Sequence, residues 1–240
     1  MKKLLAILLA TVIALALTVP AFAADGWNPI SWLKSLWEDV KAWVRRIFFP
    51  PMLEKPVIYL YPEQPMEVSV TLRLHGARFT ETIPDYNEGW CVLAQPDGTL
   101  TNLADGKTYP YLFWEALPDT PLPLPQEGFI VAREDLAGFL NEKLAYLGLN
   151  DAEAGEFAAF WLPRLLRNEY TLIHFAGKEY DERFPLQVSP APNSLLRVFM
   201  VARAAAGNER IAPQELVPFE RKGFAVIEWG GTILRRYPAT

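Results

Sequence analysis

The chain has 240 residues, 51% of them hydrophobic, and a formal net charge of −5 at pH 7. This is the composition of an ordinary globular protein. It argues against a nucleic-acid partner, because binding phosphates requires a basic patch that the sequence lacks. Cys91 is the single cysteine, so we expect the core to hold the fold together without an internal disulfide.

Residues 1–23 have the features of a secretory signal peptide. A basic start precedes an apolar run over residues 4–19, and Ala21 and Ala23 form a small-x-small cleavage motif. The run is shorter than a membrane-spanning helix requires, and an uncleaved anchor is the alternative. We therefore expect cleavage before Ala24 and a periplasmic, surface-associated or extracellular protein.

Residues 24–51 are predicted to form a tryptophan-rich amphipathic helical arm that Pro50 and Pro51 end. Its apolar stripe includes Trp37 and Trp43, and its polar side includes Arg45 and Arg46. Residues 27–49 therefore fit either a helix on a membrane surface or one that packs on protein, and the acidic residues on the polar side favour packing. Liposome flotation of the mature chain beside a chain starting at Met52 distinguishes the two, because a membrane-binding arm would be needed for flotation.

Residues 52–240 are predicted to form a single α+β domain. Residues 67–75 alternate between apolar and polar side chains, which indicates a strand with one wet face. Further strands are expected over 57–61, 90–95, 99–103, 109–116, 170–176, 195–202 and 223–229. We expect an antiparallel β-sheet or sandwich-like core.

A helical hairpin insert is predicted at about residues 133–168, after a proline-rich connector. The first helix has Gly148 available as its C-terminal cap, and the second begins with a capping box of Asn150 and Glu153. Pro163 should kink the second helix. The hairpin is expected to pack on one side of the sheet.

Several short motifs occur in order along the domain. They are KPVIYLYP at 55–62, Gly89-Trp90, YLFWE at 111–115, WLP at 161–163, RVFM at 197–200 and EWGG at 228–231. In this order they resemble the landmarks of an uncharacterised family of exported bacterial proteins, over roughly residues 54–232. The resemblance implies one continuous domain in a bacterial cell envelope. It implies no activity, cofactor or catalytic residue, and the arm lies outside it.

The common catalytic and metal-binding motifs are missing from the sequence. His75, His174 and Cys91 give no zinc spacing and no nucleophile–histidine pair. The chain also lacks a phosphate loop and a dinucleotide fingerprint, so we expect no cofactor and no metal. His75 is expected on the surface, and Cys91 is expected to be a buried small hydrophobic residue.

Two glutamates stand within apolar strands and need an explanation. Glu115 ends YLFWE, and Glu228 follows a run of apolar residues. One hypothesis makes them the acid and base of a glycan-cleaving hydrolase, because two carboxylates suffice for that reaction. The alternative, which we favour, is a structural ion pair of Arg197 with Glu115 or Glu228.

Aromatic residues offer a second functional hypothesis. A noncatalytic envelope module could bind a glycan, a peptide or a partner protein through an exposed aromatic surface. The candidate rings are Tyr59, Tyr61, Tyr86, Tyr109, Tyr111 and Trp114. We expect this binding function, with hydrolysis by Glu115 and Glu228 as the alternative.

Overall fold

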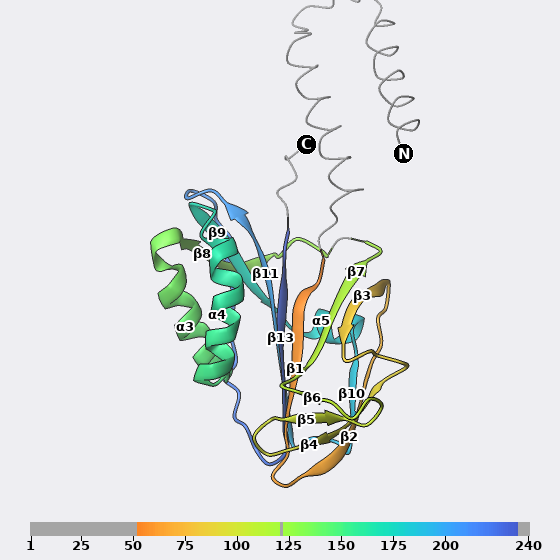
Figure 1. Cartoon of the computed structure of the whole chain (residues 1–240). Helices are drawn as coiled ribbons and strands as arrows, with labels where there is room; N and C mark the ends of the chain where they lie inside the picture. The colour runs from red at the N-terminus through yellow and green to blue at the C-terminus, as the bar shows by residue number, and fades with distance from the viewer. Residues whose placement is uncertain (1–51, 121, 235–240) are drawn as a thin grey trace, which may run out of the picture. The chain divides into compact units, whose positions relative to one another are not determined.

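The computed structural model of the protein describes residues 52–120 and 122–234 (Figure 1). The predicted signal peptide and the arm with Trp37, Trp43, Arg45 and Arg46 lie outside these residues. The described part is mostly β, with two sheets and a pair of longer helices inserted in the chain between strands. None of its helices is long and apolar enough to cross a membrane.

The larger sheet has eight strands in the order β12-β8-β9-β11-β13-β1-β7-β3. Their bounds are β1 Glu54–Tyr61, β3 Ala77–Ile83, β7 Leu112–Pro118, β8 Glu127–Ala132, β9 Tyr170–Ala176, β11 Ser194–Ala205, β12 Ala212–Pro213 and β13 Ala225–Ile233. This sheet is mixed rather than antiparallel, because β11 and β13 run in the same direction side by side. Apolar alternation marks a strand and its faces, but it carries no information about strand direction.

The smaller sheet has five antiparallel strands in the order β10-β2-β4-β5-β6. Their bounds are β2 Met66–Leu72, β4 Trp90–Ala94, β5 Leu100–Asn102, β6 Thr108–Tyr109 and β10 Leu186–Ser189. The single strand predicted over 109–116 is wrong, because Tyr109 belongs to this sheet and Leu112 begins β7 of the larger one. Pro110 lies at the break, and proline lacks the N–H that a strand ladder needs.

The helical insert lies where the sequence predicts it. It contains a short turn η1 (Arg133–Asp135), α3 (Leu136–Leu147) and α4 (Asp151–Leu165), and a further short helix α5 (Lys178–Arg183) follows β9. The predicted capping box is present, because Asn150 Oδ1 accepts from the Glu153 N–H at 2.9 Å and Glu153 Oε2 accepts from the Asn150 N–H at 3.0 Å. Gly148 ends α3 in the left-handed conformation. Pro163 lies inside α4 near its C-terminal end.

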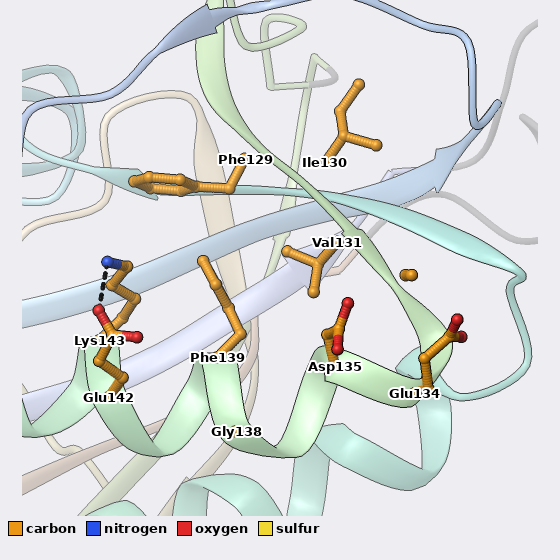
Figure 2. Close-up of a pocket in the computed structure, with 10 residues that line it drawn as sticks. Phe129, Ile130, Val131, Glu134, Asp135, Gly138, Phe139, Glu142 and Lys143 are labelled. Carbon is orange, nitrogen blue, oxygen red and sulfur yellow. Dashed lines mark hydrogen bonds and ion pairs between the residues drawn. The ribbon is translucent and has the colours of Figure 1, made fainter.

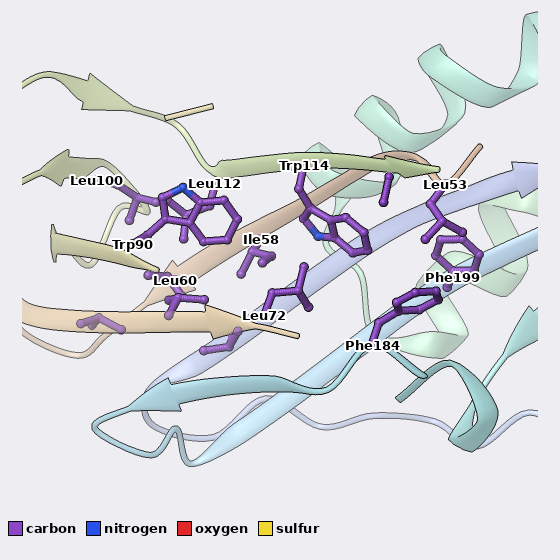
Figure 3. Close-up of a cluster of buried hydrophobic side chains, with 14 of the residues drawn as sticks. Leu53, Ile58, Leu60, Leu72, Trp90, Leu100, Leu112, Trp114, Phe184 and Phe199 are labelled. Carbon is purple, nitrogen blue, oxygen red and sulfur yellow. The ribbon is translucent and has the colours of Figure 1, made fainter. Parts of the chain in front are cut away.

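The larger sheet contributes to two hydrophobic clusters, one on each face. The first joins it to the smaller sheet and includes Trp90, Trp114, Phe184 and Phe199 (Figure 3). The second joins it to α3 and α4. It includes Leu140, Leu144, Phe157, Trp161 and Trp229. Neighbouring residues of one strand thus enter different clusters, as period-two alternation requires.

Candidate functional site

Glu228 lies in the core, where it is 1% exposed. Arg197 Nε donates a hydrogen bond to its Oε2 at 2.5 Å, and Trp114 Nε1 donates to its Oε1 at 3.0 Å. Arg197 Nη1 also donates to the Phe184 carbonyl at 2.7 Å and to Asp181 Oδ1 at 3.0 Å. Both oxygens of Glu228 therefore have partners within the protein, and the carboxylate has almost no access to solvent.

Glu115 lies on the other face of the larger sheet. It follows the buried Trp114 in β7, and successive side chains of a strand point to opposite faces. Its Oε1 accepts a hydrogen bond from the backbone N–H of Lys55 at 3.2 Å. Burial raises the pKa of Glu115, and this hydrogen bond opposes the rise.

The two glutamates therefore cannot flank one glycosidic bond. A pair of catalytic carboxylates must reach the same bond from positions in one open cleft. Here the sheet separates Glu115 from Glu228, and Glu228 is held by Arg197. The pairing that the hydrolase hypothesis requires is not formed, and of the two possible ion pairs Arg197 makes the one with Glu228.

The six candidate rings do not form one exposed aromatic surface. Trp114 is fully buried, and the Tyr86 hydroxyl donates to the Leu72 carbonyl and accepts from its N–H, both at 2.8 Å. Tyr109 lies in the smaller sheet, where its hydroxyl donates to Asp105 at 2.7 Å. The expectation that these three rings share a binding patch with the others is wrong. Alternation turns Trp114 into the core, the break at Pro110 places Tyr109 in the smaller sheet, and Tyr86 packs against the cluster between the sheets.

The remaining three rings, Tyr59 and Tyr61 of β1 and Tyr111 just before β7, form a row that we call the tyrosine row. Tyr59 and Tyr61 are stacked with ring centres 6.0 Å apart, and Tyr111 meets Tyr59 edge-on at 5.4 Å. Tyr59 is 5% exposed, whereas Tyr61 and Tyr111 are half-buried. The Tyr59 hydroxyl donates to Glu156 Oε2 of α4 at 2.9 Å, which joins the row to the helix.

The tyrosines of β1 are hydrogen-bond donors rather than bases. Burial, and then the Glu156 carboxylate, raise the pKa of Tyr59 well above its usual range. Burial, and then Glu153, raise the pKa of Tyr61 in the same way. Both phenols therefore stay protonated at any physiological pH.

Lys55 continues the site beyond Tyr111. Its Nζ lies 5.6 Å from the ring centres of Tyr111 and Phe160 and 5.8 Å from that of Trp229. A cation at these distances is attracted to the negative faces of the rings. The Lys55 backbone has φ 51°, a conformation that a non-glycine residue adopts only when its surroundings impose it. An irregularity in strand pairing between Glu54 and Val57 lies at the same place.

The sequence hypotheses omitted Lys55, although it opens the KPVIYLYP motif. The structure brings three motifs together here, because KPVIYLYP supplies Lys55 and two tyrosines, YLFWE supplies Tyr111 and Glu115, and EWGG supplies Trp229. The glycines of EWGG allow the backbone of β13 to lie close to its neighbours at this place. A Cβ on Gly230 would lie 2.8 Å from Pro56, and one on Gly231 would lie 2.8 Å from the Trp161 ring. The spacing of these motifs along the chain gives no sign that they meet.

Two further results concern reactive and metal-binding residues. Cys91 is exposed rather than buried, because Trp90 and Val92 take the core-facing positions of β4. Its Sγ lies 3.5 Å from Ser69 Oγ on the neighbouring strand. Across residues 52–120 and 122–234, no three or more histidine, cysteine, aspartate or glutamate side chains are grouped so that they could hold a metal ion.

Comparison with known proteins gives a partial relative. No family model and no solved structure matches the chain. A stretch of 64 residues is 47% identical to an uncharacterized protein in the bglA 3' region of Butyrivibrio fibrisolvens. This stretch is 25% of the chain and covers 64% of that protein. The chain is therefore a partial homologue of an uncharacterised bacterial protein.

Proposed function

We propose that the protein is a noncatalytic binding module of the bacterial cell envelope, and that its ligand is a glycan. The observation that carries the proposal is the tyrosine row beside Lys55. Tyr61 and Tyr111 are half-buried, and Lys55 Nζ lies 5.6 Å from the Tyr111 ring centre. Two carboxylates adjoin the row, because Glu115 accepts from the Lys55 N–H and Glu156 accepts from the Tyr59 hydroxyl. Of the six rings first considered for aromatic binding, Tyr61 and Tyr111 remain partly accessible, and the buried Tyr59 packs against both.

The chemistry of the tyrosine row suits a sugar. A partly exposed tyrosine offers a flat apolar face together with a polar hydroxyl. A sugar ring has the matching combination of apolar C–H groups and hydroxyls. Glu115 and Glu156 can accept hydrogen bonds from those hydroxyls, and Lys55 can donate to them. Hydrolysis by Glu115 and Glu228 is not proposed, because the two carboxylates lie on opposite faces of the sheet and Glu228 is bound by Arg197.

The envelope location is proposed from the sequence of residues 1–23. If the signal peptide is removed, the protein recovered from the periplasm or the culture medium should begin at Ala24. N-terminal sequencing measures this directly. A protein that keeps residues 1–23 and sediments with the membranes would instead support the uncleaved anchor.

Binding is tested with a panel of soluble polysaccharides and peptidoglycan fragments, using isothermal titration calorimetry. Tyr111→Ala should weaken binding of the glycan that the unmodified protein retains by roughly five- to tenfold, because it removes one ring from the contact. Tyr109→Ala is the matched control, since this tyrosine lies in the smaller sheet. Equal losses in the two variants, or no binding to any member of the panel, would count against the proposal.

A further inference from the structure

A groove lies between β8 and the beginning of α3 (Figure 2). Its volume is about 650 Å³. Residues 129–132 line it from the strand, and Asp135, Gly138, Phe139 and Glu142 are among those that line it from the helix side. The tyrosine row contributes no residue to its lining, so the groove is a separate candidate site.

The strand side of the groove is an open sheet edge. The Arg133 N–H donates to the Glu169 carbonyl at 2.9 Å, which makes these two residues a hydrogen-bonded pair at the end of the β8–β9 ladder. Because such pairs alternate, Val131 and Phe129 also bond to β9, and the main-chain groups of Ile130 and Ala132 point the other way. On that side β12 pairs with Glu127 and Gly128. Beyond them no described residue pairs with β8.

The helix side of the groove has an open floor and an aromatic wall. A Cβ built on Gly138 would meet no atom within 4 Å. Beside it, Phe139 and Phe129 pack with ring centres 5.2 Å apart. Figure 2 shows Phe139 directed from α3 toward β8, while Ile130 points away from the helix. The groove therefore has room for side chains beside an edge that can accept main-chain hydrogen bonds.

The charges around the groove are mainly negative. Glu134, Asp135 and Glu142 are all exposed and line it. Lys143 is the one cation among the lining residues. Its Nζ lies 2.8 Å from Glu142 Oε1 and 5.6 Å from the centre of the Phe129 ring. With the local charge negative, a basic partner is favoured and an acidic one is repelled.

We propose that this groove binds an extended peptide with basic side chains, which adds to the larger sheet as a strand beside β8. Strand addition obtains affinity from main-chain hydrogen bonds and specificity from pockets for alternate side chains. Here Ile130 and Ala132 supply the main-chain donors and acceptors. The alternate side chains of the peptide face α3, where Gly138 leaves space and the carboxylates meet lysine or arginine. This binding is independent of the glycan proposal.

The test uses the purified protein and a fluorescent peptide of about ten alternating lysine and valine residues, a length typical of a long strand. Fluorescence anisotropy should show saturable binding, and a glutamate–valine peptide of the same length should bind at least about tenfold more weakly because like charges repel. Gly138→Leu should weaken binding of the basic peptide by roughly tenfold by filling the floor. Ile130→Pro should also weaken binding of the basic peptide by roughly tenfold, because proline lacks the N–H that points away from β9.

Gly155→Leu is the matched control, because Gly155 is also a helical glycine whose added Cβ would meet nothing within 4 Å. Gly155 lies in α4 and does not line the groove. The Gly155→Leu variant should therefore bind the peptide as the unmodified protein does. Circular dichroism of each variant establishes that it is folded. The proposal is overturned if the basic peptide does not bind, if the acidic peptide binds equally well, or if Gly138→Leu and Gly155→Leu behave alike.

Discussion

At the scale of single residues, the clearest feature is a carboxylate buried in an aromatic core. Glu228 is surrounded by apolar side chains and is bound by Arg197 and Trp114. Removing one member of a buried ion pair leaves the other charge without compensation, which costs far more than losing an exposed pair. A glutamate in an apolar strand can therefore be the partner of a buried arginine, so two such glutamates are not by themselves evidence of a catalytic pair.

Glu228→Gln should therefore lower the free energy of unfolding by about 3–5 kcal/mol, because Arg197 would keep its charge in the core with only the exposed Asp181 as a counter-charge. Urea denaturation followed by circular dichroism measures this. Glu115→Gln is the matched control, since Glu115 has no arginine bound to it in the same way and its raised pKa shows that burial already disfavours its charge. A loss below about 1 kcal/mol for Glu228→Gln, the size expected for an exposed pair, would contradict the role assigned to this ion pair.

At the scale of elements, the helices follow from local signals and the strands follow only in part. The capping box and Gly148 determine where α4 begins and α3 ends, because each acts within a few residues of chain. Alternation likewise identifies β2 and its buried face. In contrast, the division of 109–116 between two sheets depends on partners distant in the sequence, although Pro110 is a local hint of it.

Asn150→Ala should lower the free energy of unfolding by about 1 kcal/mol, because it leaves the Glu153 N–H without its side-chain acceptor. Asn141→Ala provides the comparison, since Asn141 is exposed within α3 and alanine has the higher helix propensity. Measured by thermal unfolding, the changes in the free energy of unfolding caused by the two substitutions should thus differ in sign or clearly in size. Equal effects would mean that the cap does not stabilise α4 in the folded protein.

At the scale of the whole described part, the two hydrophobic clusters share one sheet. Phe199 enters the first cluster and Met200 the second, although they are neighbours in β11. Loss of either cluster would expose one face of the larger sheet and leave its strands without half of their packing. We therefore expect both clusters to unfold in one transition.

Whether the two clusters unfold together can be measured on a chain starting at Met52, because this chain keeps four tryptophans. Trp90 and Trp114 belong to the first cluster, and Trp161 and Trp229 belong to the second. Replacing either pair by phenylalanine leaves a fluorescent reporter of the other cluster. Within each variant the fluorescence and far-ultraviolet circular dichroism transitions should coincide in urea. A separate fluorescence transition in either variant would show that the clusters unfold independently.

The sequence by itself determined the local features of this protein: the strand faces, the helical insert with its caps, and the presence of glutamates and an arginine that need partners. These signals act over a few residues, so the order of residues is enough to read them. Only the tertiary structure decided that Arg197 meets Glu228, that Glu115 lies across the sheet, and that Lys55 joins the tyrosine row. Trp114 and Glu228 are 114 residues apart in the chain, and strand order and direction alone bring them together. Periodicity shows which face a side chain occupies, but the pairing of distant strands decides what it meets there.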